Sequence, residues 1–107
     1  MILSTTFDVH GRNVTQQLGL VRGNVVRSRF IGRDIVASLR MIVGGEIHEY
    51  TKLLAESREQ ALDRMMEHAR GMGADAVIGM RFDTCEAGGQ SGQSTEVLAY
   101  GTAVKLA

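Results

Sequence analysis

One sequence feature constrains the fold of this chain more than any other. It is a long amphipathic segment that runs through two glycines into an apolar strand. From Tyr50 to Ala69, apolar residues recur every three or four positions, and charged residues fill the positions between them. This spacing is typical of a helix that buries one face, and the charged residues indicate a solvated opposite face. Gly71 and Gly73 end the helix, because glycine readily adopts the left-handed conformation of helix C-termini.

An alternating strand follows the helix, from Ala74 to Thr84. Residues at every second position of a strand share one face of the sheet. We therefore expect one of two sets of side chains to pack against the helices. The first set is Ala76, Ile78, Met80 and Phe82, and the second is Val77, Gly79, Arg81 and Asp83.

The remaining elements are predicted from changes in the spacing of apolar residues and from the positions of glycine. Glycine marks the turns here, since the chain has thirteen glycines and no proline. Met1–Phe7 is β-prone, and Val14–Phe30 predicts a strand, a tight turn or bulge at its glycines, and a second strand. Ile31–Val43 has helical periodicity and ends at a glycine pair. Glu96–Leu106 predicts the last strand, and the glycine-rich residues 86–94 predict a hairpin loop before it.

The predicted order β-β-α-α-β-β favours an α+β domain with a largely antiparallel sheet packed against two helices. At 107 residues the chain is expected to form a single domain spanning residues 1–107.

The charge balance, the lack of long apolar segments and the cysteine content indicate which partners and which cellular compartment to expect. Twelve basic and twelve acidic side chains cancel, so we expect no nonspecific nucleic-acid binding. No segment approaches the roughly 20 apolar residues that cross a bilayer, so no membrane partner is expected. The single cysteine, Cys85, and the absence of a signal-like N-terminus favour a cytoplasmic protein.

Several spaced segments resemble the small bacterial YbjQ family, also known as UPF0145 and associated with heavy-metal binding. They are GRDIVASLRMIVGG, YTKLL, ESREQAL and GMGADAVIGMRFD, together with STT near the N-terminus and LGLVRGNVV. The resemblance covers nearly the whole chain. It implies a dodecin-like α+β subunit that assembles into a ring, a homopentamer in which short extra strands join the subunits. It implies no established activity.

The residues by themselves offer no recognisable metal site within one chain. Soft metal ions prefer thiolate and imidazole ligands, which usually come in close pairs such as C-x-x-C. This chain has one cysteine and three histidines, and no two of the four are close in sequence. A ring would multiply each ligand by symmetry. Cys85, with His48, is therefore our candidate for a soft divalent metal ion held between subunits; the alternative is that Cys85 is a small, partly buried apolar residue.

Two function classes remain open at this point. The favoured hypothesis is a non-catalytic oligomeric protein that binds a heavy metal or a small ligand at subunit interfaces, because no nucleophile or acid–base constellation is recognisable. The alternative is an enzyme whose active site is built between subunits around Arg33, Asp34 and His48. Arg33 and Asp34 are also candidate ligand-binding residues, although both fit the first turn of the helix predicted at residues 31–43.

Overall fold

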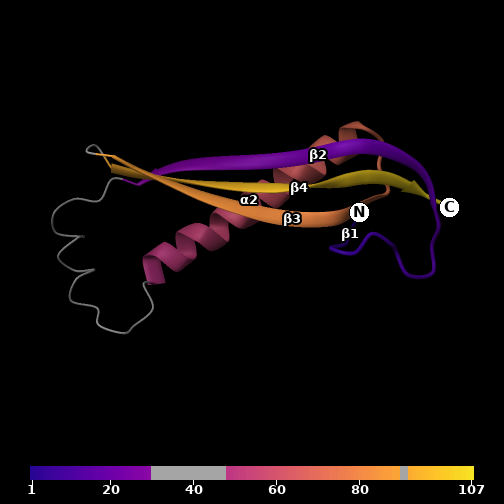
Figure 1. The fold of residues 1–107 in the computed structure, drawn as a ribbon, viewed down its shortest axis with the longest axis horizontal. Coiled ribbons are helices and arrows are strands. Elements are labelled where there is room, and N and C mark those ends of the chain that lie inside the picture. The colour runs from indigo at the N-terminus through magenta and orange to yellow at the C-terminus, as the bar shows by residue number, and fades with distance from the viewer. Residues whose placement is uncertain (30–47, 90–91) are drawn as a thin grey trace.

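The computed structural model describes residues 1–29, 48–89 and 92–107 (Figure 1). Its elements are β1 (Ile2–Leu3), β2 (Val14–Arg29), α2 (His48–Gly71), β3 (Ala76–Gly89) and β4 (Gly92–Leu106). The strands form one sheet in the order β1-β3-β4-β2. β1 pairs in parallel with β3, whereas the other two ladders are antiparallel. The α+β class is confirmed with a mixed sheet; the helix predicted at residues 31–43 lies outside the described residues.

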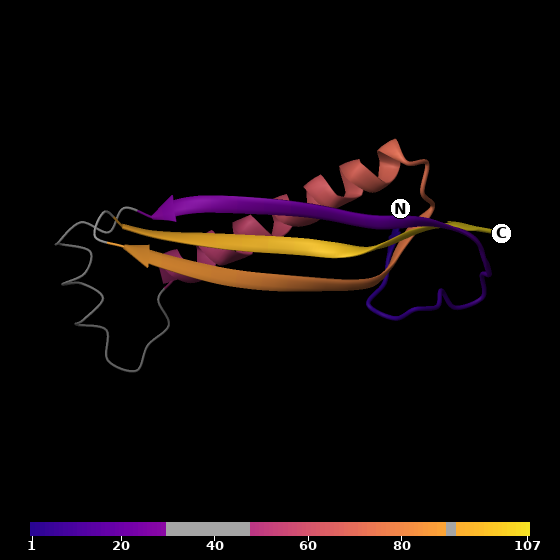
Figure 2. The ribbon, with the colours of Figure 1, turned by 45° about the horizontal axis from the view of Figure 1, so that its top comes forward.

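The predicted amphipathic helix is confirmed as α2, which crosses the three long strands diagonally on one side of the sheet (Figures 1 and 2). Ala61, Met65 and Ala69 are fully buried, one helical turn apart. They pack in one cluster with residues of all three long strands, namely Val21, Val25, Val77, Met80, Val97, Ala99 and Ala103. Among the described residues, no helix combines the length and the apolar character that a membrane span requires.

Gly23 of β2 is where helix and sheet come closest. A Cβ atom there would collide with the backbone of α2, at the carbonyl oxygen of Ala61 and the amide nitrogen of Met65. Backbone atoms cannot swing aside as a flexible side chain can. The helix therefore lies in its observed position only because residue 23 has no side chain.

β2 is a single strand of 16 residues, so the prediction of two strands across Val14–Phe30 is wrong. Of the tight turn or bulge predicted at the glycines, the bulge is confirmed, because the register with β4 shifts between Gln17 and Gly19, where Gly19 has a φ of 125°. A bulge of this kind changes the twist of a strand without ending it.

β3 contains a bulge at Gly79, which overturns the strict alternation predicted for this strand. Its register with β4 shifts between Ile78 and Arg81, and Gly79 has a φ of 60°. Val77 and Met80 consequently share the core under α2. Ala76 and Ile78 lie in a second cluster with Val104 and Leu106, against which Val9 packs.

The N-terminal segment runs beside the start of β3, and only Ile2–Leu3 of the predicted Met1–Phe7 strand is a strand. The Ser4 amide donates to the Val77 carbonyl oxygen at 2.9 Å, and the Gly79 amide donates to the Thr6 carbonyl oxygen at 2.8 Å. The regular pairing of β1 with β3 ends at Leu3 and Val77. Beyond it, around the bulge at Gly79, individual backbone hydrogen bonds rather than a ladder join the N-terminal segment to β3.

The hairpin between β3 and β4 is longer than predicted. The strands remain paired as far as Gly89 and Gly92, so most of the glycine-rich residues 86–94 belong to strands, and the connection itself lies outside the described residues. In the other half of the hairpin, the strand predicted at Glu96–Leu106 is confirmed as part of β4, with Val97, Ala99 and Gly101 buried on the helix side.

We expect Gly23→Ala to lower the free energy of unfolding by about 3 kcal/mol or more, because overpacking against backbone atoms cannot be relieved by a rotamer change. Urea denaturation followed by circular dichroism measures this. Gly71→Ala is the matched control: a Cβ there meets nothing within 4 Å, so stability should stay the same or rise by up to about 1 kcal/mol. Equal stability of the two variants would contradict the close approach.

Candidate functional site

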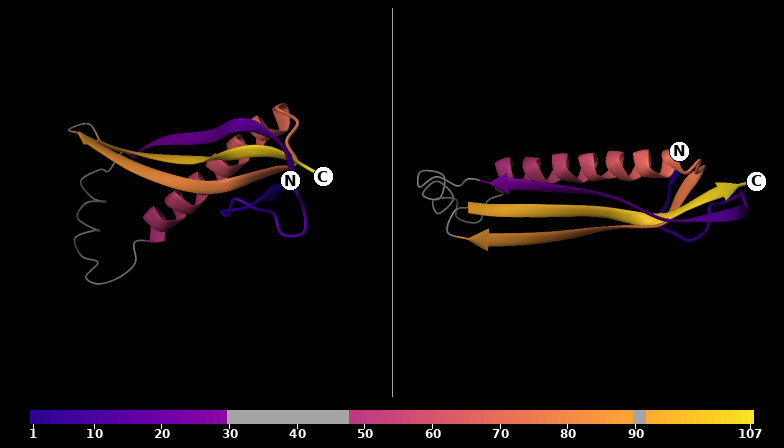
Figure 3. Two further views of the ribbon diagram at one scale, coloured as in Figure 1. Left: turned by 45° about the vertical axis from the view of Figure 1, so that its right-hand side comes forward. Right: turned by 90° about the horizontal axis from the view of Figure 1, so that it is seen from above.

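One face of the sheet lies away from α2, as the right panel of Figure 3 shows. We call it the open face. Its residues follow from the strand register: Leu20, Arg22, Asn24 and Val26 of β2; Glu96, Leu98, Tyr100 and Thr102 of β4; Arg81, Asp83 and Cys85 of β3. Leu20 and Val26 are 61% and 59% exposed. Among the described residues, the N-terminal segment packs over one end of this face, where Val9 lies against the cluster of Ala76, Ile78, Val104 and Leu106.

Cys85 lies on the open face as a free, exposed thiol. It is paired with Glu96 of β4, which is paired in turn with Val26 of β2. Asp83 shares this face two residues along the strand. Glu86 does not, because it is paired with the buried Thr95 on the helix side. The alternative interpretation, in which Cys85 is a small, partly buried apolar residue, is therefore wrong.

No metal-binding cluster exists within the described part of one subunit. No three histidine, cysteine or acidic side chains there come together as a group that could hold an ion. His48 is the first residue of α2, but its side chain lies outside the described set, as do Arg33 and Asp34. The proposed pairing of Cys85 with His48, and the enzyme alternative, stay predictions.

Side chains of α2 cover the outer edge of β2. The Arg22 amide donates to His68 Nδ1 at 3.3 Å, and Arg64 donates to the Asn24 carbonyl oxygen at 2.6 Å. These bonds satisfy backbone groups that an edge strand otherwise presents to another chain. The charged face of α2, predicted to be merely solvated, thus has a second role that the sequence pattern does not reveal.

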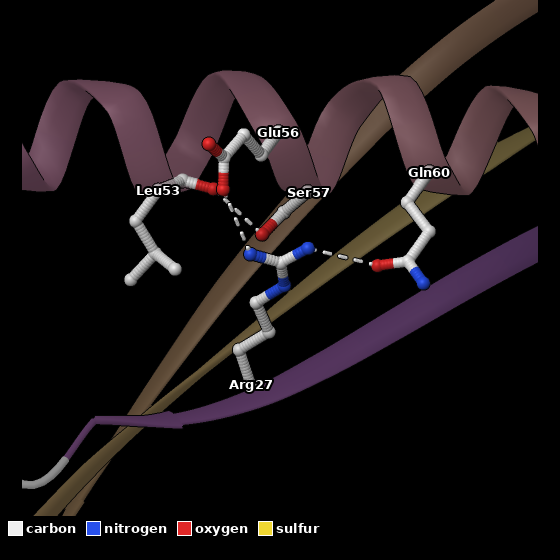
Figure 4. Close-up of polar contacts among 5 residues, drawn as sticks. All are labelled: Arg27, Leu53, Glu56, Ser57 and Gln60. Atoms are coloured by element: carbon white, nitrogen blue, oxygen red, sulfur yellow. Dashed lines mark hydrogen bonds and ion pairs between the residues drawn. The ribbon is translucent and has the colours of Figure 1, made fainter.

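Farther along β2, Arg27 lies between two residues of α2 (Figure 4). Its guanidinium group forms an ion pair of 3.3 Å with Glu56 and donates to the Gln60 side-chain oxygen at 3.0 Å. Exposed pairs of this kind contribute about 0 to 1 kcal/mol, so their main effect is to fix the helix over this edge.

The opposite edge of the sheet is different. β1 pairs with β3 only at Ala76 and Val77. No described strand pairs with the outer side of β3 from Arg81 to Glu86. Among the described residues, one edge of the sheet is therefore covered by side chains of the helix, and the other presents backbone groups that no described strand pairs with.

The N-terminal segment forms an open hollow of about 600 Å³. Its lining residues are Ile2, Leu3, Ser4, Thr6, Asp8, Val9 and His10. This hollow was not predicted. A signal exists in the sequence, because polar residues occupy every second position from Ser4 to His10, as they do when a segment presents one polar side.

Comparisons with known proteins agree with the fold and the sequence pattern. A UPF0145 protein of Methanoregula boonei is 56% identical over 97% of this chain and 83% of its own length. The UPF0145 protein of Photobacterium profundum is 51% identical over 99% and 100% of the two chains.

A solved structure shares the fold. It is a protein of unknown function from Pediococcus pentosaceus, assigned to the DUF74 family; it superposes with a TM-score of 0.69 over 100% of this chain and 98% of its own, at 14% identity. The family model described as "Putative heavy-metal-binding" matches residues 1–107. Given this match and the relatives at about half identity, the chain belongs to the YbjQ family, UPF0145.

Proposed function

We propose that this protein is a non-catalytic oligomeric binding protein that holds a soft divalent metal ion at contacts between its subunits. Cys85 supplies the thiolate ligand. The observation that carries the proposal is the exposure of this free thiol on the open face of the sheet. The description of the family as heavy-metal-binding supports the choice of ligand.

Ligand count supports a site shared between subunits. Each chain has one cysteine and three histidines, and the described part of a subunit holds no cluster of three candidate ligands. Soft metal ions favour several sulfur or imidazole ligands in tetrahedral geometry. A site with two or more thiolates therefore needs two or more copies of the chain.

The surroundings of Cys85 suit such a site. Glu96 is its cross-strand neighbour, and Asp83 lies two residues away on the same face. Carboxylates lower the cost of bringing a divalent cation to the sheet and can complete its coordination alongside a thiolate. His48 of another subunit is the proposed imidazole ligand.

Self-association is supported by the shape and surface of the subunit. Its dimensions are 55 × 27 × 15 Å and its radius of gyration is 17.7 Å, whereas a compact chain of this length has a radius of about 13 Å. Leu20 and Val26 are large apolar side chains of the open face that solvent reaches. A second copy over the open face would bury them, and the asymmetry of the two edges directs strand pairing to β3.

The proposed assembly is a ring, and the family resemblance favours a homopentamer. Closed rings arise when the same contact repeats from one subunit to the next around an axis. The axis then places equivalent Cys85 residues in one symmetric arrangement.

Charge on the open face should break the assembly. We expect the wild-type protein to be oligomeric and Leu20→Asp and Val26→Asp to shift it toward monomers, because each change places a carboxylate in an apolar contact. Native mass spectrometry and light scattering measure the mass. Both residues are exposed in the subunit, so circular dichroism should be unchanged. Glu67→Lys, on an exposed part of α2, is the control. A monomeric wild type would refute the assembly.

Removing the thiol should remove most of the affinity for a soft metal. We expect Cys85→Ser to weaken Cd²⁺ binding by tenfold or more in calorimetric titration, while the oligomer keeps its mass. Thr84→Ser, at the adjacent position on the other face of β3, should bind like the wild type. His48→Ala should weaken binding relative to His68→Ala. Unchanged affinity in Cys85→Ser would sink the metal proposal.

A further inference from the structure

The open hollow in the N-terminal segment is large enough for a small molecule and combines apolar with polar lining residues. Its volume of about 600 Å³ lies inside the range of about 300 to 1,000 Å³ typical of ligand pockets. Ile2, Leu3 and Val9 give it apolar walls, and four polar side chains share the lining. The sheet holds the segment, because the Ser4 amide donates to the Val77 carbonyl oxygen and the Gly79 amide of β3 donates to the Thr6 carbonyl oxygen.

The two hydroxyl groups in the hollow have no hydrogen left to donate. Thr6 donates its hydroxyl hydrogen to the Asp8 carbonyl oxygen at 2.7 Å. Ser4 Oγ lies 2.6 Å from Thr6 Oγ1, and since the Thr6 hydrogen is already used, Ser4 is the donor in this contact. Each hydroxyl carries a single hydrogen. Ser4 and Thr6 can therefore offer a ligand only oxygen lone pairs.

The Asp8 carboxylate gives the hollow a negative charge. Among the described residues, no hydrogen bond or ion pair engages this carboxylate, whose backbone carbonyl alone is used by Thr6. The nearby Arg12 guanidinium donates instead to the Ala107 carbonyl oxygen, at 3.1 and 3.2 Å. An ionised carboxylate is an acceptor only. Ser4, Thr6 and Asp8 can therefore only accept hydrogen bonds from a ligand, and His10 is the one other polar side chain in the lining.

We propose that this hollow binds a small molecule that carries a primary ammonium group on an apolar body. The ammonium has three N–H donors and a positive charge, which match the acceptors of Asp8, Ser4 and Thr6. The apolar body fits against Ile2, Leu3 and Val9. A bare metal ion fits less well, because the hollow is far larger than an ion and no three metal ligands gather among the described residues. The proposal is independent of the intersubunit metal site.

Titration of ¹⁵N-labelled protein with n-butylammonium, followed by NMR, tests the proposal. We expect shift changes that saturate and concentrate in residues 2–10. The neutral isostere 1-butanol should bind at least tenfold more weakly, because it lacks the charge and two of the three donors. Shifts that fail to saturate, or that spread over the surface, would overturn the site.

Two variants localise the binding. Asp8→Asn removes the charge at a side chain with no structural partner among the described residues, so the fold should persist and affinity should fall at least fivefold. Asp83→Asn removes a carboxylate from the open face and should leave the affinity unchanged. Equal losses in both variants would show nonspecific charge attraction and refute the proposal. Cys85→Ser should bind n-butylammonium like the wild type, which separates this site from the metal site.

Discussion

The fold depends on the close approach of α2 to β2 at Gly23. Because residue 23 has no side chain, the backbone of α2 lies directly against the strand, and the small residues Ala61 and Ala69 continue the contact along the helix. The same approach brings Arg64 and His68 within hydrogen-bonding distance of the outer edge of β2. This close backbone contact thus positions the core and allows side chains of α2 to cover one edge of the sheet.

The bulge at Gly79 determines which side chains reach solvent. A shift of one residue in a strand exchanges its two faces. Val77 lies in the core under α2; with uninterrupted alternation, Cys85 would lie under the helix side as well. The extra residue at the bulge instead places Met80 in the core and Cys85 on the open face beside Glu96. The accessibility of the only thiol therefore follows from the backbone of a glycine six residues earlier.

The open face and the β3 edge are the two surfaces that the proposed assembly would use. A sheet with one face against a helix and the other exposed has apolar side chains such as Leu20 and Val26 left in water, and covering them is favourable by about 25 cal/mol for each Å² removed from solvent. The N-terminal hollow lies at the end of the sheet where Val9 packs against Ile78. The two proposed sites therefore use different parts of the fold and can be tested separately.

The sequence by itself determined the family and the elements with strong periodicity, which are α2, the strand after it and the last strand. These depend on local spacing, which the chain carries in its own residues. It did not determine the continuity of β2, the faces of β3, the closed edge or the hollow. Only the tertiary structure decided these, because a glycine can produce a turn, a bulge or a close contact, and the partner segment selects among them. Gly19, Gly23 and Gly79 look alike in sequence, and each has a different role once α2, β4 and the N-terminal segment pack around them.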